Sequence, residues 1–324
     1  MMAAPGGCFG FILNDLAPEA EFPYDLGGWT IDRARAAEIE AFRPQLQTIR
    51  ELLNRPAQRG LPYEATMDDY GGGVGRLYNL PPEDWRYSVV RMREGANPDD
   101  GKILDRALRI TPDDLRIGGW VDRSGDLTER PVDLKLGQIV YWMQRWAANL
   151  VLPQTPNFAR ASEIFELRRS LNEEQFPGIS RAISIFTQLD WLPEDSDAKF
   201  LGYFSVLESI LTHSPEPLDP VDSITRQLKR NLKLLDHRMP PEENLEFSNF
   251  GQNAKSDQVI AKLYAVRSAV AHGGDAKAAF QWLHDRRPHS WRITDSYQLY
   301  LRKITQRVLV AALAEPQLVV DLRG

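Results

Sequence analysis

The stretch SDQVIAKLYAVRSAVAHGG, residues 256–274, decides how we interpret the carboxy-terminal half of this 324-residue chain. Apolar side chains recur along it at helical spacing and predict a helix over 256–272. Asp257 lies in the first turn, where a negative charge suits the helix dipole. Gly273 and Gly274 end the helix, and we expect the second glycine to take the left-handed cap conformation. The apolar stripe consists of Ile260, Leu263, Tyr264, Val266, Val270 and Ala271.

Two side chains of this helix, Arg267 and His272, suit phosphodiester chemistry. They are five residues apart, so they project roughly 140° apart around the axis and share no simple face. The histidine can take or give the proton of a 2′-hydroxyl or a leaving group. The arginine can meet the charge that builds on phosphorus. A histidine at a helix end can also serve as a cap. The spacing alone therefore leaves open whether His272 is catalytic or caps the helix.

The chain resembles the HEPN superfamily, and within it the Apea-like branch, over about residues 175–315. In that family an R-x4–6-H motif lies near the end of a late helix of a small bundle. Two protomers pair so that both motifs line one cleft, and many members cut RNA without a metal. Residue 268 departs from the family pattern, because Asn, Asp or His often follows the arginine there. The residues that carry the resemblance are the segment 200–211 (FLGYFSVLESIL), Tyr264, Arg267, Ser268, His272, Gly273 and Gly274.

The resemblance implies a metal-independent endoribonuclease that acts as a homodimer and leaves 2′,3′-cyclic phosphate and 5′-hydroxyl ends. It makes His272 the general base or acid and Arg267 the group that stabilises the phosphorane. Glu208, Tyr264 and Ser268 would position them. A carboxylate so close to an apolar stripe needs a partner if it is buried. Arg267 is then the natural partner of Glu208, and a surface glutamate is the alternative.

By analogy with the family, we expect a toxin or phage-defence role, with an amino-terminal domain that senses or restrains. RNA would be the substrate, and an antitoxin or regulatory partner would keep the activity silent. Many HEPN domains instead serve as non-catalytic dimerisation or nucleotide-binding modules, and this remains the alternative. The two interpretations differ in whether His272 is needed for cleavage that survives EDTA.

Composition and charge limit the possible functions. The chain is 43% hydrophobic and 26% charged, as in ordinary globular proteins, and it is long enough for two domains. The net charge of −6 is concentrated early, since residues 1–165 carry 19 basic and 24 acidic groups. RNA contacts must therefore come from local basic patches. Cys8 is the single cysteine, and we expect no signal peptide, no membrane span and a cytoplasmic location.

The amino-terminal part, residues 1–155, predicts an α+β domain of unknown role. Its first 28 residues are rich in Gly and Pro and predict an extended lead-in. Thr30 or Asp32 can cap a helix to about Asn54, which Pro44 would kink. Alternation predicts a strand at 85–93, and strands are also expected at 115–121 and 131–136. The segment 136–152 predicts a buried helix that carries Tyr141, Trp142 and Trp146.

Residues 156–324 predict an all-α, HEPN-like helical bundle. Pro153 and Pro156 mark the boundary in front of it. Apolar residues at helical spacing alternate with polar connections throughout this part. The expected helices are 159–172, 178–190, 196–213, 222–236, 256–272, 276–285 and 295–314.

A basic strip on helix 222–236 is the candidate RNA-binding surface. Its four cations recur at i, i+3, i+4 and i+7 and so lie on one side, opposite a core stripe of Ile224, Leu228, Leu232 and Leu235. A solvated helix face is the alternative. We expect Arg286, Arg287, Arg292, Trp282 and Trp291 to extend the basic surface. The strip itself consists of Arg226, Lys229, Arg230 and Lys233.

The remaining motifs that resemble metal- or phosphate-binding sites do not lead us to expect a cofactor. Asp133-x-Lys135 on an expected strand is the short pattern with which metal-dependent nucleases bind magnesium, whereas a surface ion pair explains it more simply. The segment 71–75 (GGGVG) lacks the Gly-Lys-Ser/Thr ending of a phosphate loop, so we expect a flexible loop. The remaining histidines have no cysteines at ligand spacing, which argues against zinc. We therefore expect no metal.

Overall fold

The structure is a computed structural model of residues 1–324, and its chain divides into two compact units. The first unit contains residues 1–109 and 113–166, and the second contains 110–112 and 167–324. The boundary expected at 155 instead falls inside helix α4 (Phe158–Ser170). The structure describes residues 8–14, 16–17, 20–39, 41, 63–67, 74–79, 87–97, 99–122, 130–134, 155–192, 196–214, 223–250, 254–286 and 296–323.

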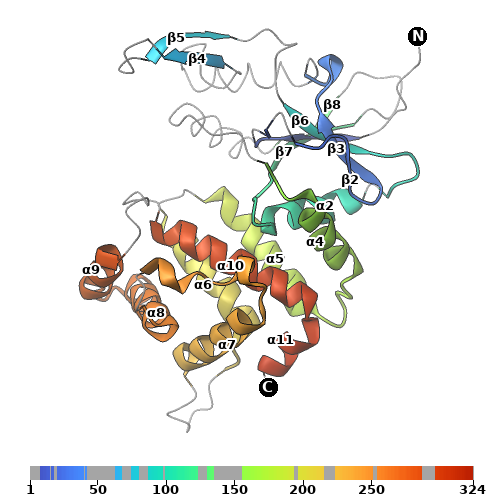
Figure 1. Ribbon diagram of the computed structural model, residues 1–324. Coiled ribbons are helices and arrows are strands. Elements are labelled where there is room, and N and C mark those ends of the chain that lie inside the picture. The colour runs from blue at the N-terminus through green and yellow to red at the C-terminus, as the bar shows by residue number, and fades with distance from the viewer. Residues whose placement is uncertain are drawn as a thin grey trace. The chain divides into compact units, whose positions relative to one another are not determined.

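The first unit is built on an antiparallel sheet (Figure 1). Six described strands pair in the order β2-β3-β6-β1-β7-β8, with β1 hydrogen-bonded to both β6 and β7. Two further strands, β4 (Tyr63–Met67) and β5 (Val74–Asn79), form a separate antiparallel pair. The α+β class expected for this part is confirmed. The six strands are β1 (Phe9–Ile12), β2 (Tyr24–Asp25), β3 (Trp29–Arg33), β6 (Ser88–Met92), β7 (Ile117–Asp122) and β8 (Arg130–Leu134).

The prediction that a helix begins at Thr30 or Asp32 is wrong, because both residues lie in β3. Trp29 and Ile31 are buried and alternate with half-buried neighbours, which is the two-residue period of a strand. The chain turns helical only at Ala36. The remainder of that expected helix, with Pro44, lies outside the described residues, as does the expected helix with Tyr141, Trp142 and Trp146.

Helix α2 (Asp100–Ile110), which sequence periodicity did not reveal, packs on the sheet through a glycine. A Cβ atom at Gly101 would lie 3.2 Å from the ring of Trp29, tighter than an ordinary van der Waals contact, so the helix packs closely on Trp29 at this glycine. Trp29 and Trp120 meet edge to face with their ring centroids 5.4 Å apart. A Cβ at Gly10, on the central strand, would lie 3.0 Å from Trp120. This aromatic pair, packed against two glycines, is one part of a core that also contains Phe9, Phe11, Val89, Val90 and Leu104.

The second unit is a helical bundle (Figure 1). All seven helices expected over residues 156–324 are confirmed to within about two residues at each end, and the first of them, α4, crosses the boundary between the two units. Helix α11 (Pro316–Leu322) was not expected, because it is short and follows α10 almost directly. The confirmed helices are α4, α5 (Pro177–Gln188), α6 (Asp197–Leu211), α7 (Ile224–Arg238), α8 (Ser256–His272), α9 (Lys277–Arg286) and α10 (Ser296–Ala314).

Helix α6 is the central element of this bundle. It contacts α5, α7, α8 and α10, and eight of its fifteen residues are buried. A helix that is apolar on most of its circumference is stable only when other elements surround it. A Cβ at Gly202 would meet the side chain of Leu189 at 2.2 Å, so this position needs glycine for close packing.

Two buried polar residues of α7 satisfy the backbone where α6 ends. Asn231 is fully buried, and its Nδ2 donates to the carbonyl of Leu211 at 2.6 Å. Gln227 Oε1 accepts the amide of His213 at 2.9 Å. The last carbonyls of a helix have no partner within the helix, so these contacts tie the end of α6 to α7. Within the described part of the chain, no helix is both long and apolar enough to cross a membrane.

Candidate functional site

The segment that decides the bundle forms helix α8 over the expected residues, Ser256–His272. Val259, Ile260, Leu263 and Val266 are buried, whereas Ala271 of the expected stripe is exposed. The expectation about the cap is wrong, because Gly273 rather than Gly274 takes the left-handed conformation, with φ of 69°. Both glycine amides donate to the carbonyl of Ala269, which ends the helix directly after His272.

Glu208 of α6 and Arg267 of α8 form an ion pair, which is one of the two alternatives that the sequence left open for Glu208. Arg267 Nη2 lies 3.2 Å from Glu208 Oε2. The two side chains keep only 22% and 17% of their surface exposed, so water screens the pair incompletely. Glu208 therefore holds the guanidinium in one place at the α6–α8 contact.

Tyr264, one helical turn before Arg267, completes the cluster. The guanidinium carbon of Arg267 lies 5.5 Å from the centre of the Tyr264 ring, and the ring meets Phe204 edge-on at 5.8 Å. Burial and, to a lesser extent, the Glu208 carboxylate raise the pKa of the Tyr264 phenol, while Arg267 lowers it. Sequence reasoning missed Phe204, although it lies four residues before Glu208 on the same helix.

The cluster retains unused hydrogen-bonding capacity. Glu208 Oε1 and Arg267 Nε are both buried, and neither has a hydrogen-bond partner among the described residues. A buried polar atom without a partner costs free energy, so such atoms mark a place where a ligand or a further group can bind.

His272 and Ser268 lie apart from this cluster. His272 is the last residue of α8 and is exposed, and its side chain contacts no other described residue through a hydrogen bond or ion pair. Ser268 is half-buried. The structure thus brings together Arg267, Glu208 and Tyr264 and leaves His272 at the end of the helix. The angular separation of Arg267 and His272 expected from helix geometry accounts for this difference.

The predicted basic strip lies on α7. Arg226, Arg230 and Lys233 are exposed and Lys229 is half-buried. Ser223 caps the helix by accepting the amide of Arg226, which fixes the start of the strip. Of the additional residues, Arg286 stacks on Trp282 of α9 at 4.4 Å from the ring centre. Arg287, Trp291 and Arg292 lie outside the described residues.

The described residues give no metal site, since they include no cluster of three potential His, Cys, Asp or Glu ligands. Asp133 of the alternative magnesium motif lies in β8 opposite Trp120. Its partner Lys135 and the glycines at 71–73 lie outside the described residues.

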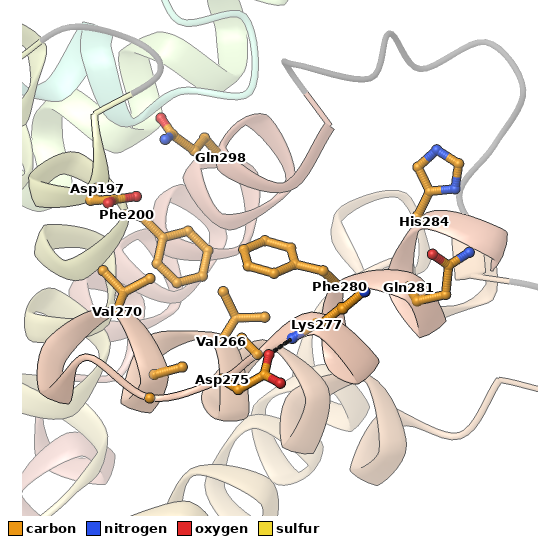
Figure 2. Close-up of a pocket in the computed structure, with 13 residues that line it drawn as sticks. Asp197, Phe200, Val266, Val270, Asp275, Lys277, Phe280, Gln281, His284 and Gln298 are labelled. Atoms are coloured by element: carbon orange, nitrogen blue, oxygen red, sulfur yellow. Dashed lines mark hydrogen bonds between the residues drawn. The ribbon is translucent and has the colours of Figure 1, made fainter.

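Sequence reasoning also missed a hollow enclosed by α6, α8, α9 and α10 in the second unit (Figure 2). Its volume is about 760 Å³, and its walls include Phe200, Val266, Val270 and Phe280. The residues come from four helices, of which α6 is distant in the chain from the other three, so no local motif indicates the hollow. Comparisons with protein-family models, curated proteins and solved structures found no match to this chain.

Proposed function

We propose that this protein is a metal-independent endoribonuclease of the HEPN type. The observation that carries the proposal is the fixed guanidinium of Arg267, held by Glu208 and Tyr264 on the helix that ends in an exposed His272. The ion pair pre-orients a cation whose side chain keeps 22% of its surface exposed. Pre-oriented donors stabilise developing charge more than mobile ones, because they need no reorganisation during the reaction.

The active enzyme in this proposal is a homodimer. Arg267 and His272 do not converge within one chain, so a phosphate that meets both types of group needs two copies of α8. Pairing two helix ends places two imidazoles and two guanidiniums around one cleft. A closed two-fold dimer is the commonest symmetry that achieves this.

The reaction follows from these groups. The imidazole of one His272 takes the proton of the 2′-hydroxyl, and the 2′-oxygen attacks phosphorus. Arg267 stabilises the charge on the phosphorane, with Ser268 and Tyr264 beside it. His272 of the second copy, protonated, gives its proton to the leaving 5′-oxygen, so the products are a 2′,3′-cyclic phosphate and a 5′-hydroxyl. The basic strip of α7 would follow the RNA backbone.

The proposed biological setting is a toxin or phage-defence protein that acts on RNA in the cytoplasm. The first unit would sense a signal or restrain the nuclease, together with an antitoxin or regulatory partner. A non-catalytic HEPN module that dimerises or binds nucleic acid is the second candidate. It is favoured by the Glu208 carboxylate, which already neutralises the charge of Arg267.

The test is cleavage of a mixed RNA pool in EDTA by the purified full chain and by its His272→Ala variant. His237→Ala is the matched control, because His237 is also exposed in the last turn of a bundle helix. We expect wild type and control to cut the RNA and His272→Ala to be inactive. The ends that the active proteins leave should be joined to an adaptor only after the terminal phosphate is removed and the 5′-hydroxyl is phosphorylated. Cleavage that EDTA abolishes, or cleavage that survives His272→Ala, would contradict the nuclease.

A further inference from the structure

A second hollow in the helical bundle lies between the start of α5, the end of α6 and α11, and we call it the α11 hollow. Its volume is about 430 Å³, which lies within the roughly 300–1,000 Å³ of small-ligand sites. Ile179 and Val319 are buried in its wall, whereas Val320 is 48% exposed and Phe176 is half-buried. An apolar group that covers this exposed surface would be removed from water together with it, which favours binding.

A cation without a counter-ion borders this apolar surface. Among the described residues that line the α11 hollow, Arg323 alone carries a permanent charge, and none is a carboxylate. Within the described part of the chain the Arg323 guanidinium makes no hydrogen bond or ion pair. Asp321, the nearest carboxylate along the chain, instead accepts a hydrogen bond from Gln317 Nε2 at 2.9 Å. The hollow therefore offers a charge that an anion would complement, in a chain whose net charge is −6.

The guanidinium of Arg323 lies against the backbone of α5 at the wall of the hollow. A Cβ atom at Gly178 would lie 3.3 Å from Arg323 Nη1, so the guanidinium packs across this glycine. Helix α11 packs on α6 and α10, and the amide of Arg323 donates to the carbonyl of Val320 at 3.1 Å. One turn of the chain thus supplies both the cation and the exposed apolar side chain.

We propose that the α11 hollow binds a small molecule that has an anionic head group and an apolar body. The apolar body covers Val320 and Phe176, and the head group pairs with Arg323. A guanidinium can donate two parallel hydrogen bonds to a carboxylate or to a phosphate, so the head group is one of these two. The proposal does not depend on the nuclease, because none of the candidate catalytic residues lines this hollow.

The experiment is isothermal titration calorimetry of the full chain with octanoate, octyl phosphate, 1-octanol and octylammonium, which share one apolar body. We expect the two anions to bind about two- to fivefold more tightly than 1-octanol, the contribution of one exposed ion pair. Octylammonium should bind more weakly than 1-octanol, and acetate, which lacks the apolar body, should not bind measurably. The anion that binds more tightly identifies the head group. If neither anion binds, or if 1-octanol binds as tightly as both, the proposal is wrong.

Charge variants of Arg323 test the role of the head group. Arg323→Gln should bind octanoate and 1-octanol equally, and Arg323→Glu should bind octylammonium more tightly than octanoate. The side chain is exposed and without partners among the described residues, so both variants should keep the melting temperature of the parent. Arg181→Gln removes an exposed cation of α5 outside the hollow and is the matched control. A preference for octanoate that survives Arg323→Gln, or that Arg181→Gln also abolishes, would overturn the proposal.

A variant of Val320 tests the role of the apolar body. Val320→Ala should weaken octanoate and 1-octanol by the same factor, about two- to tenfold, because it removes apolar surface that both probes cover. Leu234→Ala removes an exposed apolar side chain of α7 outside the hollow and should leave both affinities unchanged. High salt should reduce the advantage of octanoate over 1-octanol. Affinities that Val320→Ala leaves unchanged would place the probes elsewhere on the protein and contradict the proposed site.

Discussion

Glu208 and Arg267 lie 59 positions apart in the sequence, yet their side chains meet at 3.2 Å where α6 packs on α8. The carboxylate uses one oxygen and the guanidinium one terminal nitrogen, which leaves Oε1 and Nε buried and unpartnered. The pair thus joins helices α6 and α8, and it leaves one donor atom and one acceptor atom without a hydrogen bond among the described residues. Mutation at these two positions should therefore affect both the packing of α6 on α8 and the proposed site.

Removing one partner of this pair should destabilise the protein more than removing both. Glu208→Ala leaves a largely buried guanidinium without its counter-ion, and we expect the free energy of unfolding to fall by about 1–3 kcal/mol. The double variant with Arg267→Ala should recover part of that loss, with a coupling energy of about 0.5–3 kcal/mol. Urea denaturation of the wild type, the two single variants and the double variant measures this coupling energy. Losses of stability that simply add in the double variant would argue against a coupled pair.

The phenol of Tyr264 should titrate above its ordinary pKa of 10.0, because burial and Glu208 both disfavour the phenolate. Glu208→Gln should lower that pKa and Arg267→Gln should raise it. The stability contributed by neutral Tyr264 is fully present below the pKa of the unfolded chain and is lost as pH rises through the higher folded pKa. Absorbance at 295 nm, taken as wild type minus Tyr264→Phe, isolates this phenol; a midpoint at or below the ordinary value would contradict the cluster.

The two glycines after His272 should differ in their tolerance of a side chain. Gly273 has φ of 69°, so Gly273→Ala should cost about 1 kcal/mol of stability. A Cβ at Gly274 meets only ordinary contacts, the nearest being Ala269 Cα at 3.5 Å, so Gly274→Ala is the matched control with little effect. Thermal denaturation compares the two. Equal losses would show that the left-handed cap does not fix the end of α8.

The basic strip should determine how RNA affinity depends on salt. Lys229→Gln/Lys233→Gln removes two cations of the strip, and the slope of log affinity against log salt should become shallower by up to about 1.4, or roughly 0.7 per lost phosphate contact on single strands. Lys255→Gln/Lys303→Gln removes the same charge from exposed lysines elsewhere in the second unit and should leave the slope unchanged. Anisotropy titrations at several salt concentrations measure both. Equal slopes in the two variants would leave the strip as a solvated helix face.

The second unit was largely predictable because its signals are local. An apolar stripe with a period near 3.6 residues predicts a helix whatever the helix packs against. This is why α8 has the expected bounds and why Arg267 and His272 diverge as expected. The partnership of Glu208 with Arg267 was also predictable, since a carboxylate beside an apolar stripe needs a cation.

The first unit was less predictable because its elements depend on contacts distant in the chain. Trp29 to Arg33 carries both apolar and polar residues, and pairing with β6 selects the strand over the expected helix. Helix α2 contains Gly101, a residue that usually weakens a helix, and its close contact with Trp29 accounts for a glycine at this position. No short sequence window contains that information.

By itself the sequence determined the helices of the second unit, the divergence of Arg267 and His272, and the four cations on one side of α7. Only the tertiary structure decided that Asn231 and Gln227 are buried at the end of α6, and that Phe280 and Gln298 face one hollow. The physical reason is the range, along the chain, of the interactions that decide each feature. Helix formation and facing follow from hydrogen bonds and side-chain spacing over a few residues, whereas burial and cavities depend on which distant helices pack together.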